Sequence, residues 1–180
     1  MIVPTATNIH RRLGFLRIVL AVSTMRRPRL LVSGAWLFHG AAWFLPVVTR
    51  IAGGRIGPPI RGWQAFLIAS SAAWEGDSSW YGVVLAVLSV ITTILFIVGS
   101  PWVMFRGTRS VLRPSAWGAG AAFFLNAHWL LGTDGWTSGL GIGYFLWWWS
   151  FILLSLGLFD LAGQNDAAVA AHSQAAVIPR

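Results

Sequence analysis

Long apolar runs alternate with short polar and basic stretches along the chain. Four of these runs have the length that a helix needs to cross roughly 30 Å of membrane hydrocarbon. We therefore predict an all-α membrane protein with four transmembrane helices, at about residues 30–49, 81–105, 115–132 and 142–162. Residues 163–180 are Ala-rich and polar, and we predict a flexible cytoplasmic tail there.

Two shorter apolar stretches predict helices that do not cross. Residues 13–25, within a basic N-terminal segment over residues 1–29, are flanked by arginines, which is typical of a helix in the cytoplasmic interface. Residues 62–74 fall short of the roughly 20 residues that a spanning helix needs. We predict a short helix there that lies on the outer face of the membrane or re-enters it. The Gly- and Pro-rich residues 50–61 predict a connection made of turns.

The distribution of arginine predicts the orientation of these helices. All 13 basic residues are arginines, against five acidic residues. Four spans put most of them on one side, at Arg11, Arg12, Arg17, Arg26, Arg27, Arg29, Arg106, Arg109, Arg113 and Arg180. The positive-inside rule makes this side cytoplasmic, together with both termini. A fifth span at residues 62–74 would move residues 106–113 outside, so we predict a four-span protein of the bacterial inner membrane.

Composition excludes several classes of function. Only 10% of the residues are charged and 56% are hydrophobic, whereas a soluble domain has roughly a quarter charged residues, so the lipid bilayer is the expected partner. The arginines flank apolar runs instead of forming a stripe on a soluble face, so we predict no nucleic-acid binding. The absence of cysteine excludes disulfides, thiolate metal sites and cysteine nucleophiles. No phosphate-binding loop, HExxH or GxSxG motif occurs, so we predict neither an enzyme nor a metal site.

Tryptophans and small residues indicate how the helices are anchored and packed. Amphipathic indoles favour the depth of the headgroups, so we expect interface anchors at Trp63, Trp74, Trp80, Trp102, Trp117 and Trp136. Residues 147–149 are three consecutive tryptophans that cover almost a full helical turn, so at least one ring must face other helices and needs a partner for its N–H. Four-residue spacings of small residues predict close helix packing at Ala116, Gly118, Gly120, Ala122, Gly139 and Gly143.

Two histidines, His39 and His128, lie well inside predicted spans, where ionisable residues suggest function. Ala35 precedes His39 by four residues, and this spacing resembles the pigment-binding spans of bacterial light-harvesting polypeptides, where a small residue makes room for the macrocycle. Phe124 fills the equivalent position before His128. One interpretation is that either histidine binds a haem or a bacteriochlorophyll. The alternative is a neutral histidine bonded to a neighbouring helix or to water, with no cofactor. We also expect Asp160 to pair with a cytoplasmic arginine.

Three short motifs resemble a group of small four-span bacterial inner-membrane proteins. They are FLP at residues 44–46, GWQAF at residues 62–66 and GYFLWWWSF at residues 143–151. The resemblance covers about residues 30–162 and implies four helices with a re-entrant outer segment. It implies no catalytic residue and no agreed activity.

The function that these patterns favour is not enzymatic. We expect a structural or accessory subunit that packs against other membrane proteins in a larger complex. One alternative is a haem- or bacteriochlorophyll-binding subunit of a photosynthetic or respiratory complex. A second is a small transporter or channel, with Ser89, Thr92 and Thr93 lining a polar path, although such hydroxyls more often bond to their own helix.

Overall fold

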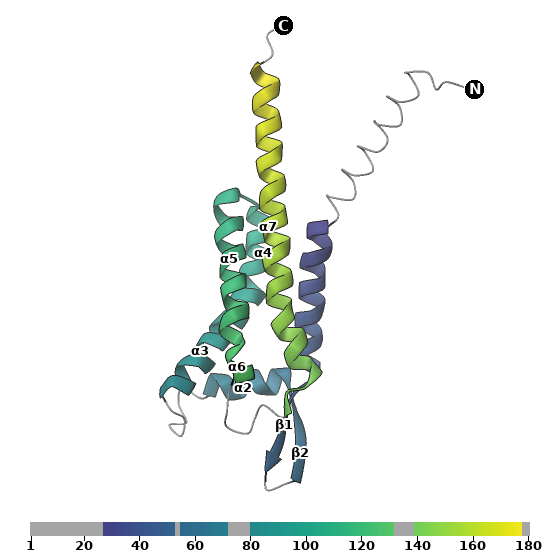
Figure 1. Cartoon of the computed structure of the whole chain (residues 1–180), viewed down its shortest axis with the longest axis vertical. Coiled ribbons are helices and arrows are strands. Elements are labelled where there is room, and N and C mark those ends of the chain that lie inside the picture. Colours follow the sequence, from purple (N-terminus) through teal and green to yellow (C-terminus); the bar gives the residue numbers. More distant parts are fainter. Residues whose placement is uncertain (1–26, 53–54, 72–79, 132–138, 178–180) are drawn as a thin grey trace, which may run out of the picture.

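The structure, a computed structural model, describes residues 27–52, 55–71, 80–131 and 139–177. The chain is mostly helical, with a small two-stranded sheet at one end (Figure 1). Two helical stretches are long and apolar enough to cross a membrane, Trp80–Arg106 and Ile142–Ala171. They coincide with two of the four predicted spans, and the helical fold class is confirmed. The helix predicted over residues 13–25 lies outside the described residues.

The first helix covers residues 27–44 and ends before the predicted limit of its span at residue 49. Leu45 precedes Pro46, and a proline disfavours the helical conformation of the residue before it. The N–H of Leu45 still bonds to the carbonyl oxygen of Ala41, at 3.2 Å. The chain then turns into an extended strand, so residues 46–49 are not helical as we had predicted.

The prediction of a turn-laden connection at residues 50–61 is wrong, because most of this segment pairs as a hairpin. Strand β1 (Pro46–Ala52) lies antiparallel to β2 (Arg55–Arg61). The β-branched residues of β1, at positions 47–49 and 51, favour an extended backbone. Strand β2 contains two prolines, which an edge strand tolerates, and β2 pairs only with β1 among the described residues. Two register shifts interrupt the pairing.

Helix α2 (Gly62–Ser71) follows the hairpin directly, within the predicted helix at residues 62–74. Its start is capped by Gln64, whose side-chain oxygen accepts the backbone N–H of Arg61 at 2.9 Å. Figure 1 shows α2 lying across the ends of the long helices, next to the hairpin. None of its residues is buried.

A single rod, made of α3 (Trp80–Ile94), the π-helical turn η1 (Leu95–Gly99) and α4 (Ser100–Arg106), forms the second predicted span. Pro101 follows the π turn at the start of α4. A proline lacks the N–H for a regular helical bond and collides with the preceding turn, and a wider turn just before it relieves both problems.

The basic connection after this rod is shorter than we predicted. Gly107 caps α4 with a left-handed backbone (φ 55°), and its N–H donates to the carbonyl oxygen of Val103 at 3.0 Å. Thr108 is the N-cap of α5 (Arg109–Asn126). Pro114, which directly precedes the span predicted at residues 115–132, lies inside α5. After a turn at Ala127 comes the short helix α6 (His128–Leu131).

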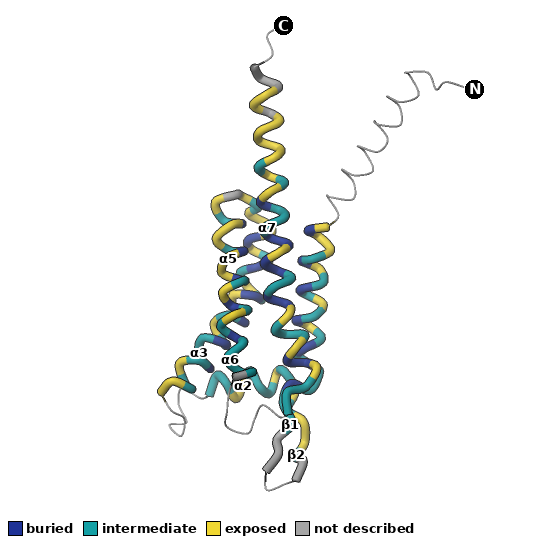
Figure 2. The backbone as a smooth tube through the Cα atoms, in the orientation of Figure 1, coloured by how far each residue is buried: buried dark blue, intermediate teal, exposed yellow. Residues whose placement is uncertain are grey.

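Helix α7 (Ile142–Val177) continues far beyond the predicted end of its span. The prediction of a flexible tail is therefore wrong for residues 163–177. An established helix grows without a new nucleation step, and the alanines of this segment have the highest helix propensity. Figures 1 and 2 show this extension projecting beyond the other helices, with most of its surface exposed.

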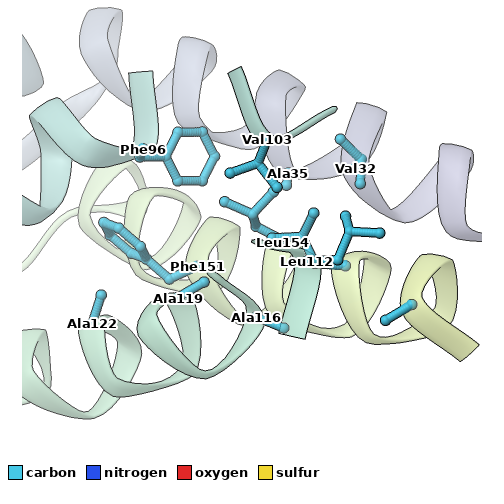
Figure 3. Packing of buried hydrophobic residues seen from close by; sticks show 12 residues of the cluster. Val32, Ala35, Phe96, Val103, Leu112, Ala116, Ala119, Ala122, Phe151 and Leu154 are labelled. Atoms are coloured by element: carbon cyan, nitrogen blue, oxygen red, sulfur yellow. The ribbon is translucent and has the colours of Figure 1, made fainter. Parts of the chain in front are cut away.

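The hydrophobic core lies where the first helix, the α3–α4 rod, α5 and α7 meet. The side chains that fill it are mostly alanine, leucine and phenylalanine (Figure 3). They are Val32, Ala35, Phe96, Val103, Leu112, Ala116, Ala119, Ala122, Phe151, Leu154, Leu158 and Ala162. We call the end of this bundle with β1, β2 and α2 the hairpin end, and the end with Arg27 and the α4–α5 connection the arginine end (Figure 1).

Candidate functional site: a polar network across the bundle

His39 lies in the interior of the bundle. The residue is 2% exposed, and its Nδ1 lies 3.0 Å from Oγ of Ser150 on α7. Ser150 Oγ donates its own proton to the carbonyl oxygen of Trp147. The Ser150 oxygen can therefore only accept from His39, so Nδ1 carries the ring proton. In the neutral ring the other nitrogen, Nε2, is then an acceptor.

Aromatic rings enclose the imidazole of His39. Phe96, from the π-helical turn, stacks on it with the ring centroids 4.0 Å apart and an interplanar angle of 9°. Phe151 of α7 meets the imidazole edge-on at 5.9 Å and Phe96 at 5.4 Å. Figure 3 shows these two phenylalanines reaching into the core from different elements. Within the described part of the chain, no donor reaches Nε2.

A tetrapyrrole does not fit this packing at His39. Ala35, the small residue expected to leave room for a macrocycle, is 0% exposed. Figure 3 shows it beside Val103 and Leu154, in the core where the helices meet. The space that Ala35 leaves is therefore used by other side chains, and a macrocycle would require the helices to separate. The contacts instead match the alternative interpretation, a histidine bonded to a neighbouring helix.

Three hydroxyl residues of α3 form the second part of the site. The side chains of Thr92 and Thr93 both donate to the carbonyl oxygen of Ser89, at 2.9 Å each. Their own oxygen atoms remain free to accept. Thr93 Oγ1 accepts from the indole N–H of Trp147 at 3.3 Å, and Ser89 Oγ accepts from that of Trp129 at 3.4 Å. The hydroxyls of Thr92 and Thr93 thus bond to their own helix, as expected, and those of Thr93 and Ser89 also accept from two tryptophans.

Asn126 completes the site at the end of α5, and it is 0% exposed. Its Nδ2 donates to Thr92 Oγ1 at 3.1 Å and to the carbonyl oxygen of Ala122 at 2.8 Å. The carbonyl can only accept, which fixes the orientation of the amide. Its backbone carbonyl oxygen accepts the hydroxyl of Tyr144 at 2.8 Å. The side-chain oxygen, Oδ1, has no partner among the described residues.

These bonds form one polar network that crosses the bundle. Trp147 is the link between its halves, since its carbonyl oxygen binds Ser150 and its indole N–H binds Thr93. Trp148 also has a partner, because its indole N–H donates to the carbonyl oxygen of Phe123 at 2.7 Å, while Trp149 is exposed. The expectation for the three consecutive tryptophans is confirmed: rings that face other helices find acceptors.

His128 does not take part in this network. Its Nδ1 lies 2.8 Å from the carbonyl oxygen of Leu125, which belongs to the preceding turn of the same chain segment. The residue is half-buried and lies against the ring of Trp129, with the centroids 4.8 Å apart. No hydrogen bond or ring contact joins it to His39. The two candidate histidines therefore have separate surroundings.

The predicted small-residue positions divide into three groups. Ala116 and Ala122 are buried, and a Cβ at Gly120 would lie 3.3 Å from Oγ of Ser155 on α7, so these three serve helix packing. Gly118 faces outwards, and a Cβ there would meet nothing within 4 Å. A Cβ at Gly139 would collide with the backbone of Thr49, and one at Gly143 would lie 2.9 Å from the carbonyl oxygens of Leu45 and Pro46. The last two therefore pack against strand β1 and its start.

Four of the six expected tryptophan anchors lie within the described chain. They are all exposed: Trp63, Trp80, Trp102 and Trp117. Trp102 lies near the arginine end, where the guanidinium of Arg106 stands 5.7 Å from its ring centroid. The other two anchors, Trp74 and Trp136, lie outside the described residues.

Two ion pairs fasten α7 at the arginine end. Asp160 lies 3.2 Å from Arg27 of the first helix, so the expected pairing with an arginine is confirmed. Asp166 lies 2.8 Å from Arg113 of α5. Next to it, Asn165 Nδ2 donates to the carbonyl oxygen of Gly107 at 2.7 Å. These contacts hold the first turns of the α7 extension against the α4–α5 connection.

Sequence reasoning missed Ser150, Ser155 and Tyr144, which bond across helices through single hydroxyl groups. Hydroxyl residues are common in apolar helices, and nothing in their spacing distinguishes these positions.

No group of acidic residues and histidines suited to a metal ion occurs among the described residues. Comparisons of the chain with protein-family models, curated proteins and solved structures gave no match.

Proposed function

We propose that the chain is an accessory subunit of the bacterial inner membrane that crosses it four times and packs against other membrane proteins in a larger complex. Both termini are cytoplasmic in this proposal, and α2 lies in the outer interface. The resemblance of its motifs to small four-span bacterial membrane proteins agrees with this layout.

The arrangement of the helices supports four spans. The first helix and α5 run alongside the two apolar stretches, Trp80–Arg106 and Ile142–Ala171, over much of the same extent (Figure 1). The arginine end carries the start of the first helix and the α4–α5 connection, as a shared cytoplasmic side requires. The crosswise orientation of α2, with Trp63, Leu67 and Ile68 exposed, suits a helix in the outer interface.

Site-specific labelling tests this layout directly. Because the chain has no cysteine, single cysteines can be introduced without background. We expect Thr108→Cys, in the α4–α5 connection, to react with an impermeant maleimide only after the cytoplasmic side is opened. Pro58→Cys, exposed on β2, should react in intact spheroplasts. Labelling of both positions from the same side would reject the four-span layout.

The face of α5 that points away from the bundle is the main observation in favour of a packing function. Trp117 and Phe124 are 70% and 73% exposed, and Gly118 and Ala121 lie exposed on the same face. A Cβ at Gly118 would meet nothing within 4 Å. Small residues let helix backbones approach closely in lipid, where apolar burial alone contributes little to association. This face therefore has the shape that a helix of another subunit needs.

Co-purification from native membranes, in a mild detergent, tests this function. We expect Gly118→Leu to reduce the recovery of partner subunits, because the new side chain adds bulk next to Trp117 at the edge of this exposed face. Gly40→Leu is the matched control, since Gly40 is also exposed and a Cβ there also meets nothing within 4 Å. A chain that migrates alone, or equal recovery from both variants, would reject the proposal.

One observation favours the cofactor-binding alternative, namely the free acceptor at His39 Nε2, which is the form that binds a metal ion. The close packing around Ala35 and Phe96 opposes it. The absorption spectrum of the native protein decides: a haem or bacteriochlorophyll band that disappears in His39→Ala would support that function in place of ours.

A further inference from the structure

The two ends of the polar network carry unpartnered atoms of the same kind. At His39 the bond to Ser150 uses the only ring proton, which leaves Nε2 as an acceptor. At Asn126 both bonds of Nδ2 are directed to acceptors, which leaves Oδ1 as an acceptor. No donor within the described part of the chain reaches either atom.

Both acceptors lie where an unpaired polar atom is costly. His39 is 2% and Asn126 0% exposed, within helices that we assign to the membrane interior. Hydrocarbon provides no hydrogen bonds, and buried polar groups in proteins are almost always paired. Each acceptor therefore needs a donor that the described residues do not provide.

The surroundings restrict the donor to a small neutral molecule. A cation would need a carboxylate nearby, but those of the described residues, Asp160 and Asp166, are paired with arginines at the arginine end. Phe96 and Phe151 are 2% and 1% exposed and pack directly against the imidazole of His39, so a large ligand there would have to displace them.

We propose that the network binds buried water, one molecule donating to His39 Nε2 and another to Asn126 Oδ1. A buried water needs two or more polar partners. Ser100, one helical turn after Phe96, carries a further hydroxyl that is unpartnered among the described residues, and its backbone N–H bonds to the carbonyl oxygen of Phe96. Phe96 belongs to the π-helical turn, and such turns are frequent at functional sites.

Solid-state NMR of the full-length protein, labelled with ¹⁵N-histidine and reconstituted in phosphatidylcholine vesicles, tests the water at His39. We expect a ring with Nδ1 protonated and Nε2 unprotonated but hydrogen-bonded. Polarisation should pass from water protons to this ring and should disappear in D₂O. The His39→Gln variant identifies the resonance. A ring protonated at Nε2, no transfer from water, or transfer that persists in D₂O would each overturn the proposal.

Two variants separate the bound water from the packing of the bundle. Ser150→Ala removes the acceptor that selects the tautomer, so both tautomers should appear while the transfer from water remains. Asn126→Leu removes the distant acceptor, and the water signal at His39 should persist, because that molecule is bound separately. Loss of the His39 signal in a folded Asn126→Leu variant would contradict two separate sites. If either variant fails to fold, the wild-type spectrum still decides for His39.

Discussion

Two glycines of α7, six residues apart, should respond in opposite ways to the same substitution. Gly157 lies against the first helix: an added Cβ would be 2.8 Å from Cγ2 of Val32 and 3.2 Å from its backbone nitrogen. An added Cβ at Gly163, in the segment that we had expected to be flexible, meets nothing within 4 Å. Gly157→Ala should therefore destabilise the fold, and Gly163→Ala should stabilise it.

The magnitudes follow from two opposing effects. Replacing a helical glycine with alanine gains about 1 kcal/mol of helix propensity, and Gly163→Ala should keep this gain because the methyl group meets no neighbour. At Gly157 the methyl group must displace a neighbouring backbone as well as a side chain, and such overpacking costs about 1–3 kcal/mol. We expect a net destabilisation of about 0–2 kcal/mol for Gly157→Ala, so the two variants should differ by about 1–3 kcal/mol.

Reversible unfolding in mixed micelles, by titration with SDS and followed by circular dichroism, measures this difference. Each variant is compared with the unmodified chain under the same conditions, and size exclusion confirms that both are folded. Equal stabilisation by the two alanines would refute the reasoning, because it would mean that the first helix does not approach α7 at Gly157. Equal destabilisation would mean that α7 is not helical at Gly163.

Three further predictions concern contacts of α7 and of the network. A double-mutant cycle of Thr92→Val and Asn126→Ala should give a coupling free energy of about 0.6 kcal/mol in the same titration, the average for polar contacts between membrane helices, and a zero value would contradict their bond. Asp160→Asn should change the unfolding free energy by less than about 1 kcal/mol, because its partner Arg27 is 74% exposed, and a larger loss would show that the pair is shielded. Deleting residues 167–180 should lower the helical signal but not the unfolding midpoint, since Asp166 is the last residue of α7 with a contact to α5 or the α4–α5 connection among the described residues; a lower midpoint would reveal docking of the extension.

Each error of prediction has an identifiable cause. The segment at residues 50–61 is rich in glycine and proline, which usually indicates turns, but its pairing with β1 was not visible in either strand alone. The bridge between Val48 and Leu140 adds a contact that is still more distant in sequence. Residues 163–177 lack a helix breaker apart from Gly163, and we gave more weight to their polar character than to the helix that precedes them.

The candidate site was predicted only in part. His39 was found because an ionisable residue in an apolar run is rare, and Asp160 because charges at the end of a run are expected to pair. The partner of His39, however, is one serine among many hydroxyl residues, 111 positions away. Asn126 was not among the predicted site residues, although its side chain bonds to both α3 and its own helix.

The order of apolar and basic residues by itself determined the helical class and two of the membrane-spanning candidates. It also determined the positions of the arginines, from which we predict the orientation of the helices. Hydrophobic length and charge act locally, so a sequence displays them directly. The tertiary structure decided which polar atoms meet inside the bundle, which tautomer His39 adopts and which glycines allow close contact. Those properties depend on the distance between atoms of different helices, and only the packing of the helices sets it.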